Sequence, residues 1–321
     1  EYNTLKIIDY SRRAADAGCR LAIFPELAVS GYPPLDLLER RSFVDDHERA
    51  VADLLNNLPD IDVMFGAFER RKQGAGKPLY NSVLVCREGA IIHRARKQLL
   101  PAYDVFDENR YFEPGEMPEI YRIDDTKIAV TVCEDIWHAA IGEYQVDPVA
   151  DILEHARRQG EEIDFVVNVS ASPFHRGKDG IRREIFSRFS REYQVPFFYV
   201  NQVGGQDSLL FDGHSQALDG NGEVIARAAS FQEDMVFVDT VSWSGEKRQR
   251  DESSELKDIH DALVMGIRDY VGKTGFSSVV MGLSGGIDSA LTAVLSVEAL
   301  GPENVLGVAL PSLYSSRESI E

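Results

Sequence analysis

Short apolar segments alternate with amphipathic ones over the first 240 residues, and this alternation constrains the fold more than any other feature. Apolar residues recur at helical spacing near residues 4–17, 36–57, 147–159 and 180–193. The strand-like segments are residues 20–24, 62–69, 81–87, 90–98, 127–133, 164–171, 196–204, 214–219, 223–228 and 235–241. Because these strands outnumber the helices and include both hairpin-like pairs and strand–helix units, the sequence predicts a layered α/β sandwich with mixed sheets. The string DGNGE, residues 219–223, predicts a tight turn between two strands.

A charged, serine-containing stretch without apolar periodicity, residues 241–258, interrupts this pattern. The pattern after it is different: a helix over 258–275, a strand over 277–283, a glycine-rich turn, a helix over 288–301 and a strand over 304–311. That order is typical of one βαβ unit of a parallel sheet. We therefore predict a first domain over residues 1–241, a linker over 242–257, and part of a second domain over 258–321.

Composition excludes several classes of protein. The net charge of −19 over 321 residues argues against a nucleic-acid binder, because phosphate affinity comes from clustered Lys and Arg. The three cysteines, Cys19, Cys86 and Cys133, are scattered and predict neither a disulfide framework nor a zinc site. No apolar run reaches the ~18 residues of a membrane-spanning helix. The sequence predicts a soluble cytoplasmic protein with no membrane partner.

The glycine-rich turn has the chemistry of a phosphate site. Gly285 and Gly286 allow backbone angles closed to other residues and a close approach of a ligand. The following helix offers free N–H groups at its positive end, and Ser284 and Ser289 add hydroxyls. No Lys stands at the helix start, as it does in the GxxxxGK[ST] loop, so a grip on pyrophosphate is expected. Asp288 is a candidate Mg²⁺ ligand. The competing interpretation is a strand–helix turn whose glycines serve packing.

The full string SGGIDS, in its strand–turn–helix setting, resembles the signature of the PP-loop ATP pyrophosphatase superfamily. Members of that superfamily activate a carbonyl oxygen with AMP and release pyrophosphate. The resemblance covers about the last 45 residues and implies a Rossmann-like domain that uses ATP with Mg²⁺. It implies a metal role for Asp288 and ATP-binding roles for Gly282, Leu283, Ser284, Gly285, Gly286, Ile287, Asp288 and Ser289.

Three polar residues of complementary chemistry each follow an apolar strand: Glu26, Lys97 and Cys133. Taken singly, the first two are typical solvated charges and the third a typical buried small hydrophobe. Taken together, they predict one site, because the ends of neighbouring strands meet at one sheet edge. A carboxylate takes a thiol proton, a thiolate attacks an amide carbonyl, and an ammonium stabilises the oxyanion. A cation near Cys133 would also lower the pKa of its thiol.

The strings FPEL, the Lys before a proline-containing turn, and CEDIW resemble, in that order, the Glu–Lys–Cys motifs of the nitrilase superfamily. The resemblance covers roughly residues 3–240 and implies an α-β-β-α sandwich. It implies that Glu26 is the general base, that Lys97 orients the substrate and stabilises the oxyanion, and that Cys133 is the nucleophile that forms a thioester. A nitrilase domain opens with a strand before its first helix, and the expectation is that this strand is missing here.

A nitrilase-like half followed by a PP-loop half resembles one family, the glutamine-dependent NAD⁺ synthetases. Further strings that are similar to that family are SGYPPLDLL, YDVFDENRYFEPG, NVSASPFHRGKDGIRRE, GIRDYVGKTGF, GLSGGIDSALTAVLSVEALG and PSLYSSRESIE. The resemblance implies that glutamine is hydrolysed and that its ammonia converts ATP-adenylated deamido-NAD⁺ to NAD⁺, AMP and diphosphate. It also implies a homo-oligomer, with no tightly bound organic cofactor. The synthetase domain is expected to be incomplete in this chain, as is the first domain, whose opening strand is expected to be missing.

The same resemblance implies that Tyr103, Ser172 and Lys178 bind glutamine, with surface-loop roles as the alternative for each. Glu108 is a candidate for a second acid near Lys97, and Trp137 is expected to serve packing. Two other functions stay open: a stand-alone amidase or carbamoylase with a vestigial nucleotide domain, and another PP-loop amidotransferase, acting on a purine nucleotide or on asparagine. The first predicts turnover without ATP, and the second usually carries a different glutaminase. A non-catalytic binding module does not account for a complete Glu, Lys and Cys set.

Overall fold

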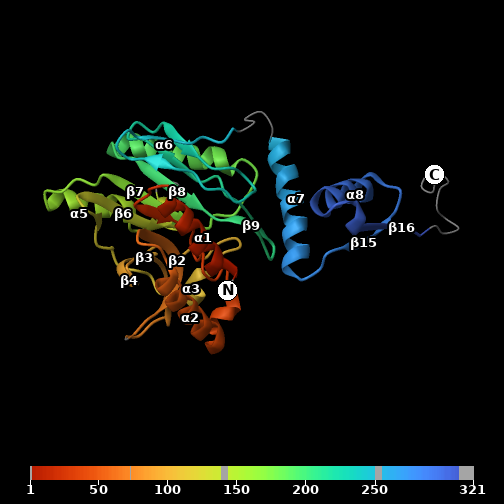
Figure 1. Ribbon diagram of the computed structural model, residues 1–321, viewed down its shortest axis with the longest axis horizontal. Coiled ribbons are helices and arrows are strands. Elements are labelled where there is room, and N and C mark those ends of the chain that lie inside the picture. The colour runs from red at the N-terminus through yellow and green to blue at the C-terminus, as the bar shows by residue number, and fades with distance from the viewer. Residues whose placement is uncertain (1, 73, 139–143, 250–254, 311–321) are drawn as a thin grey trace.

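The structure is a computed structural model that describes residues 2–72, 74–138, 144–249 and 255–310. In Figure 1 the chain runs from a layered body that contains both sheets of the first part to helix α7, Glu255–Lys273, and then to a smaller unit at the C-terminal side. The string PSLYSSRESIE, singled out above, lies outside the described residues.

Two sheets form the centre of the layered body. The first has the order β1-β2-β3-β4, with β1 parallel to β2 and the other pairs antiparallel. Its strands are β1 Leu21–Ile23, β2 Asp62–Arg70, β3 Leu79–Arg87 and β4 Ala90–Arg96. The second has the order β12-β11-β8-β7-β6-β5, with β6, β7 and β8 parallel. Its strands are β5 Tyr121–Ile123, β6 Thr126–Val132, β7 Phe165–Ser170, β8 Phe197–Asn201, β11 Gln216–Leu218 and β12 Val224–Arg227.

Helices cover the outer faces of both sheets. The inner faces bury one apolar cluster, in which Met64 and Val85 of the first sheet meet Val130 of the second. A second cluster joins the first sheet to α1, Tyr2–Asp16, and α2, Arg41–Asn57. A third joins the other sheet to α5, Pro148–Arg158, and α6, Lys178–Tyr193. The predicted α-β-β-α sandwich is confirmed, because each sheet buries apolar side chains on both faces.

Several local predictions need correction. The helix predicted over 36–57 is a 3₁₀ turn, Leu35–Glu39, followed by α2, because Arg40 between them has extended backbone angles. The strand predicted over 196–204 divides into β8 and β9, Val203–Gln206, and β9 pairs with the unpredicted β10, Leu209–Asp212. Of the strand predicted over 235–241, only β13, Val238–Asp239, forms, and it pairs with β14, Ser244–Gly245. The turn over 219–223 is confirmed between β11 and β12.

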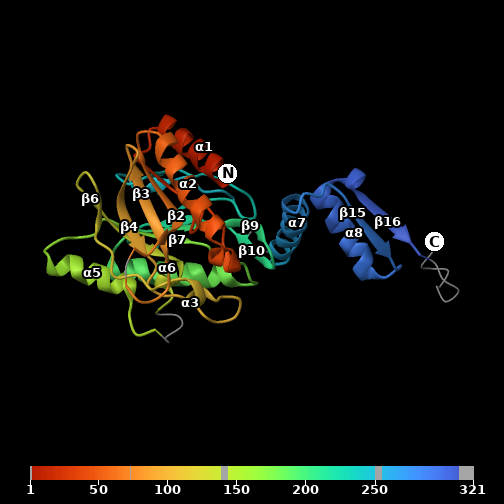
Figure 2. The same cartoon turned by 90° about the horizontal axis from the view of Figure 1, so that it is seen from below.

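The smaller unit begins inside the predicted linker, since α7 starts at Glu255. Helix α7 contacts β9, where the carboxylate of Asp269 accepts a hydrogen bond from Gly205 N at 2.7 Å. Strand β15, Val279–Leu283, lies parallel to β16, Val305–Ala309, and α8, Ile287–Leu300, connects them through a 3₁₀ turn, Pro302–Asn304. The βαβ prediction is therefore confirmed (Figure 2).

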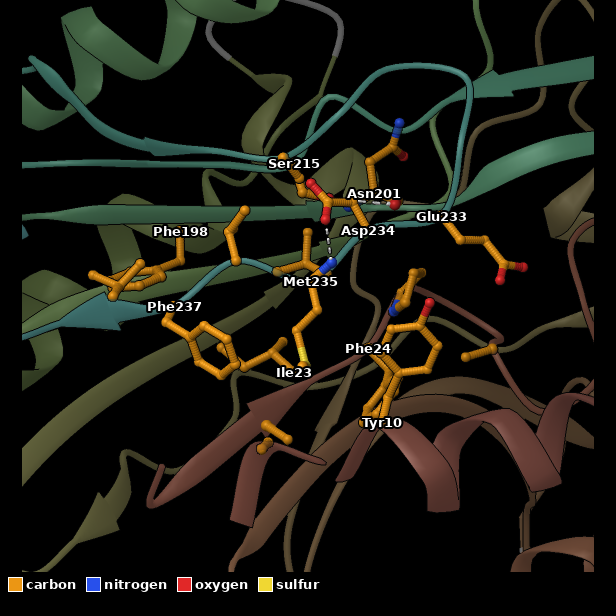
Figure 3. A pocket seen from close by; sticks show the side chains of 18 of the residues that line it. Tyr10, Ile23, Phe24, Phe198, Asn201, Ser215, Glu233, Asp234, Met235 and Phe237 are labelled. Atoms are coloured by element: carbon orange, nitrogen blue, oxygen red, sulfur yellow. Dashed lines mark hydrogen bonds between the residues drawn. The ribbon is translucent and has the colours of Figure 1, made fainter. Parts of the chain in front are cut away.

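The outer edge of β1 faces a cavity of about 1450 Å³. Figure 3 shows Tyr10 of α1 and Ile23 and Phe24 on one side of it, with Met235 and Phe237 on the other. Phe24 N donates to Met64 O on β2, at 2.8 Å, so the neighbouring Ile23 amide faces away from β2. A strand beside β1 would lie in this cavity. The expectation of a missing first strand remains a prediction.

Candidate active site

Glu26 stands in the turn that follows β1, and its side chain is fully buried. The turn lies so close to β2 that a Cβ on Gly66 would come 2.1 Å from Leu27 N. Only glycine fits at position 66 for that reason, and Gly66 N donates to Pro25 O at 3.0 Å. The close approach fixes the backbone that carries the Glu26 carboxylate.

Lys97 directly follows β4 and reaches the same place. Its Nζ donates to Glu26 Oε1 at 2.8 Å and to Glu108 Oε1 at 2.6 Å, and all three side chains are buried. Burial disfavours the ammonium, but the two carboxylates outweigh it, so the pKa of Lys97 is held well above its usual value. Glu108 lies in α3, Glu108–Tyr111, and burial raises its pKa although Lys97 opposes this. The expected second acid near Lys97 is therefore present.

Cys133 directly follows β6 and opens a 3₁₀ turn, Cys133–Ile136, with a positive φ of 42°. A non-glycine residue rarely adopts this backbone conformation, which is costly and recurs at active sites. Asp135 holds the turn: its Oδ2 accepts from Val132 N at 3.0 Å, and its Oδ1 accepts from the backbone amides of Gln98 and Leu99. The carboxylate of Asp135 thus connects the cysteine turn to the segment that carries Lys97.

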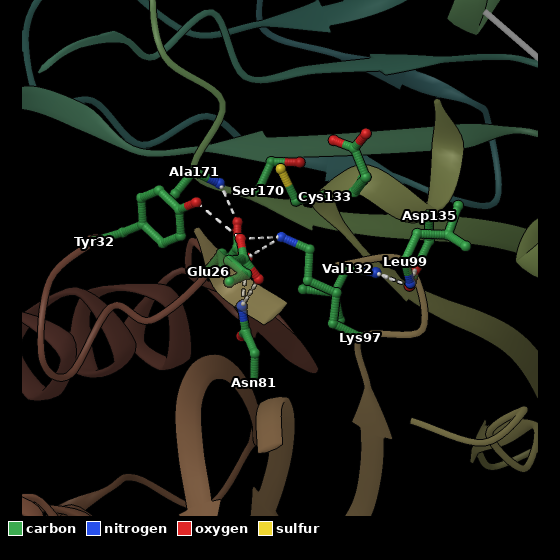
Figure 4. A network of polar contacts seen from close by, with 12 residues as sticks. Glu26, Tyr32, Asn81, Lys97, Leu99, Val132, Cys133, Asp135, Ser170 and Ala171 are labelled. Carbon is green, nitrogen blue, oxygen red and sulfur yellow. Dashed lines mark hydrogen bonds and ion pairs between the residues drawn. The ribbon is translucent and has the colours of Figure 1, made fainter. Parts of the chain in front are cut away.

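The three predicted catalytic residues meet at one edge between the sheets. In Figure 4 the side chains of Cys133, Lys97 and Glu26 point toward one another. Burial and the charge of Glu26 raise the pKa of the Cys133 thiol above its usual value, although Lys97 acts in the opposite direction. The expected lowering of the thiol pKa by the nearby cation is present, but burial and Glu26 outweigh it. A raised pKa favours the thiol form of Cys133 over the thiolate.

The residues predicted to bind glutamine differ in how closely they approach this edge. They are Tyr103, Ser172 and Lys178. Tyr103 Oη donates to Glu134 Oε1 at 2.9 Å, and Tyr144 Oη donates to the same oxygen at 2.8 Å. Lys178, the first residue of α6, has its Nζ 5.6 Å from the centre of the Trp137 ring. Burial, with the charge of Arg182, lowers the pKa of Lys178 to about 8. Trp137 packs against the cluster beneath α5 and α6, as expected.

Ser172 is buried and is held by a polar network that the sequence analysis missed. Its N–H donates to Asn201 Oδ1 at 2.8 Å, and its carbonyl accepts from Arg182 Nη2 at 2.8 Å. Arg182 and Asp212 form a fully buried ion pair, 2.7 Å at its shortest. Burial disfavours the Asp212 carboxylate, yet Arg182 outweighs it and lowers its pKa to about 2. Buried charges are paired in this way in folded proteins.

Other site residues were also missed. Tyr32 Oη donates to Glu108 Oε1 at 2.8 Å, and Asn81 Nδ2 donates to Glu26 Oε1 at 2.7 Å. The available signal for Asn81 was a polar residue inside the apolar run LYNSVLV, which predicts a buried group with a partner. The string CEDIW contains Glu134 and Asp135, but the sequence did not indicate which residues they contact.

The glycine-rich turn forms at the start of α8, as predicted. Gly285 has a φ of +79°, but Gly286 has ordinary extended angles, so only Gly285 needs glycine for its backbone. The hydroxyls of Ser284 and Ser289 lie 3.1 Å apart, and Asp288 is exposed in the first helical turn. Within the described ranges, no group of three or more His, Cys, Asp or Glu side chains is placed to hold a metal ion. No helix there is long and apolar enough to cross a membrane.

Comparison with known families agrees with this arrangement. Residues 1–244 match the family model described as carbon-nitrogen hydrolase. The chain belongs to the carbon–nitrogen hydrolase family. Residues 259–321 match the model described as NAD synthase. The predicted boundaries of 241 and 258 lie near the ends of these matches and stay predictions.

Relatives of this carbon–nitrogen hydrolase are named glutamine-dependent NAD(+) synthetases. One from Synechocystis sp. is 42% identical over 99% of this chain and 58% of its own length, and one from Thermotoga maritima is 38% identical over 100% and 59%. The chain thus spans less than two thirds of these relatives. The structure of a glutamine-dependent NAD+ synthetase from Acinetobacter baumannii, in complex with ADP, has a TM-score of 0.88 at 36% identity, over 99% of this chain and 58% of that one. An amidase of the nitrilase superfamily from Nesterenkonia, 18% identical with a TM-score of 0.57 over 71% of this chain and 80% of that one, shares the fold.

Proposed function

We propose that this chain supplies the glutaminase and the start of the ATP site of a glutamine-hydrolysing NAD⁺ synthase. The proposal depends on one observation: Glu26, Lys97 and Cys133 are buried close together, with Nζ of Lys97 2.8 Å from the Glu26 carboxylate. The names of the relatives, together with the NAD synthase match over residues 259–321, support the synthetase half.

In the proposed glutaminase reaction, the Glu26 carboxylate accepts the proton of the Cys133 thiol as the sulfur attacks the amide carbonyl of glutamine. The carbonyl π electrons move to oxygen, and the Lys97 ammonium stabilises the oxyanion. When the tetrahedral intermediate collapses, the C–N bond breaks and the leaving nitrogen takes the proton from Glu26, which releases ammonia. Water, deprotonated by Glu26, then attacks the thioester and releases glutamate with the thiol restored.

Substrate recognition is proposed to rest on Tyr103, Ser172 and Lys178. The ammonium of Lys178 is a positive group for the α-carboxylate of glutamine, and its electrostatic interactions with Cys133 and Glu134 support a place near the nucleophile. Tyr103 reaches Glu134, the residue after the nucleophile, through its hydroxyl. Ser172 is held from beneath by Arg182 and Asn201, so its position is preorganised.

In the synthetase half, residues 282–289 are proposed to bind ATP through the glycine turn, the N-terminus of α8 and the hydroxyls of Ser284 and Ser289. A carboxylate at Asp288 suits Mg²⁺, which binds through one or two carboxylates with water and phosphate oxygens. The metal would neutralise phosphate charge. Deamido-NAD⁺ would be adenylated there and then amidated by ammonia from the glutaminase. A cytoplasmic homo-oligomer is part of the same proposal.

The test uses the full-length protein with deamido-NAD⁺, ATP and Mg²⁺, and measures NAD⁺, AMP and diphosphate. Glutamine and free ammonia are compared as nitrogen donors in the wild type and in Cys133→Ala. We expect Cys133→Ala to lose the glutamine-driven reaction while ammonia still supports it. Amide hydrolysis by the wild type without NAD⁺ from either donor would overturn the synthetase assignment and leave an amidase.

A further inference from the structure

Asn81 is a buried polar residue in the middle of an apolar strand. It lies on β3, opposite Phe68 of β2 in the register, and its exposed fraction is 1%. The proposed reaction gives it no chemical step. A buried amide that only filled space would be a costly choice, because each of its polar atoms needs a partner.

Asn81 contacts Glu26, Glu108 and Lys97 through two groups. Its Nδ2 donates to Glu26 Oε1 at 2.7 Å and to Glu108 Oε2 at 3.3 Å. Its backbone carbonyl accepts from Lys97 N at 2.8 Å. The neighbours of the side chain are carboxylates, which accept hydrogen bonds, so the NH₂ group must face them. Its Oδ1 is left buried without a hydrogen-bond partner in the part of the chain that the structure describes.

We propose that Asn81 is a positioning residue that holds the two carboxylates of Glu26 and Glu108 as separate ionised acceptors and assigns proton transfer to one oxygen of Glu26. The inference rests on the proposed function of Glu26 as the base. The geometry gives the reason. Oε1 of Glu26 already accepts from Asn81 and from Lys97. Among the residues that the structure describes, Oε2 accepts from Ala171 N alone, at 2.8 Å. Oε2 therefore keeps a free lone pair for the thiol proton.

An amide is the side chain that this position requires. The two acids share the ammonium of Lys97, so the cluster carries more negative than positive charge. A neutral donor with two N–H groups stabilises both acids without adding charge. A carboxylate at position 81 would remove both donors and add a third negative charge. Both changes, the lost donors and the added charge, favour uptake of a proton by Glu26 and Glu108. A protonated base cannot accept the proton of Cys133.

The experiment compares the wild type with Asn81→Asp, Asn81→Ala and the control Ser82→Ala. Ser82 is the next residue on β3 and is fully buried, and its hydroxyl has no partner among the described residues, so its removal leaves the acids untouched. The first readout is the pH dependence of Cys133 alkylation by iodoacetamide, followed by mass spectrometry of the Cys133 peptide. The second is kcat and KM for glutamine.

We expect the acid limb of the alkylation profile to move up by about one pH unit in Asn81→Asp, and by less in Asn81→Ala. We expect kcat for glutamine to fall about tenfold or more with KM little changed, because Asn81 lies behind the acids. Ser82→Ala should match the wild type. An unshifted profile in both Asn81 variants, with or without lower activity, would overturn the proposal and leave a structural role. If the wild type does not hydrolyse glutamine but the profiles still shift, the proposed function fails while the role of Asn81 stands.

Discussion

Lys97 Nζ lies 2.6 Å from Glu108 Oε1, and this buried ion pair joins α3 to the strand end that carries the proposed oxyanion stabiliser. Lys97 is shared between two carboxylates, Glu108 and Glu26. Glu108 therefore balances the pull of the proposed base on the ammonium. Without Glu108, Lys97 would pair with Glu26 alone, and the stronger pairing would make the Glu26 carboxylate a weaker base.

Replacement of Glu108 by Gln keeps the shape of the side chain but removes its charge. We expect kcat for glutamine hydrolysis to fall about 10²-fold, because Lys97 then pairs only with Glu26 and weakens it as a base. Steady-state kinetics measures this, with Glu88→Gln, an exposed turn residue, as the control. Wild-type kcat in Glu108→Gln would show that the second acid is dispensable.

Asp135 links the cysteine turn to the Lys97 segment, so its removal should affect both. In Asp135→Asn, one carboxylate oxygen becomes an NH₂ group that faces backbone N–H donors. We expect a loss of about 1–3 kcal/mol in the free energy of unfolding, measured by urea denaturation. Asp125→Asn, in the exposed turn between β5 and β6, should be neutral. Equal stability of the two variants would mean that these hydrogen bonds contribute nothing net.

The buried His47 and the half-buried His93 predict a pH dependence of stability. Burial lowers the pKa of His47 to about 4, and burial lowers the pKa of His93 to about 4 as well. The unfolded chain, with pKa values near ~6.5, binds more protons than the folded one between about pH 4 and 6.5. Stability should therefore rise with pH across this window, and the contribution of these histidines should be lost as the pH falls from about 6.5 to about 4.

Urea titrations at pH 5 and pH 7 measure this slope. The slope reports the number of protons taken up on unfolding, and we expect His47→Gln to reduce that number by about one at pH 5. His175→Gln, at an exposed position, should leave it unchanged. An identical slope in His47→Gln and the wild type would rule out His47 as a source of the effect.

The cavity beside β1 predicts a difference between adjacent amides. Phe24 N is bonded to Met64 O, whereas Ile23 points away from β2 toward the cavity. In the chain described above, hydrogen exchange should be faster at Ile23 than at Phe24. Equal protection at both residues would show that the edge of β1 is covered.

Sequence alone could predict the sandwich, because strand and helix periods are local and each sheet faces its core with apolar residues. It could also place Glu26, Lys97 and Cys133 at strand ends that converge. It could not predict the contacts of Asn81 or Asp135, which join segments far apart in the chain through side chains. The strand predicted over 235–241 was too long for a different reason. Residues 235–237 have the apolar pattern of a strand but line the cavity, and backbone pairing begins at Phe237, whose carbonyl accepts from Glu246 N. The net shift of the thiol pKa could not be predicted, because the lowering by Lys97 cannot be weighed against burial and the charge of Glu26 until the fold is known.

The central claim is that Cys133 is the nucleophile of a glutamine-cleaving site. The most direct measurement is the mass of the Cys133 peptide after the protein is mixed with a glutamine analogue that carries a diazoketone in place of the amide. We predict one covalent adduct on Cys133, prevented by excess glutamine and lost in Glu26→Gln, with Cys19 and Cys86 unmodified. A Cys133 peptide without adduct, from protein that still hydrolyses glutamine, would contradict the account.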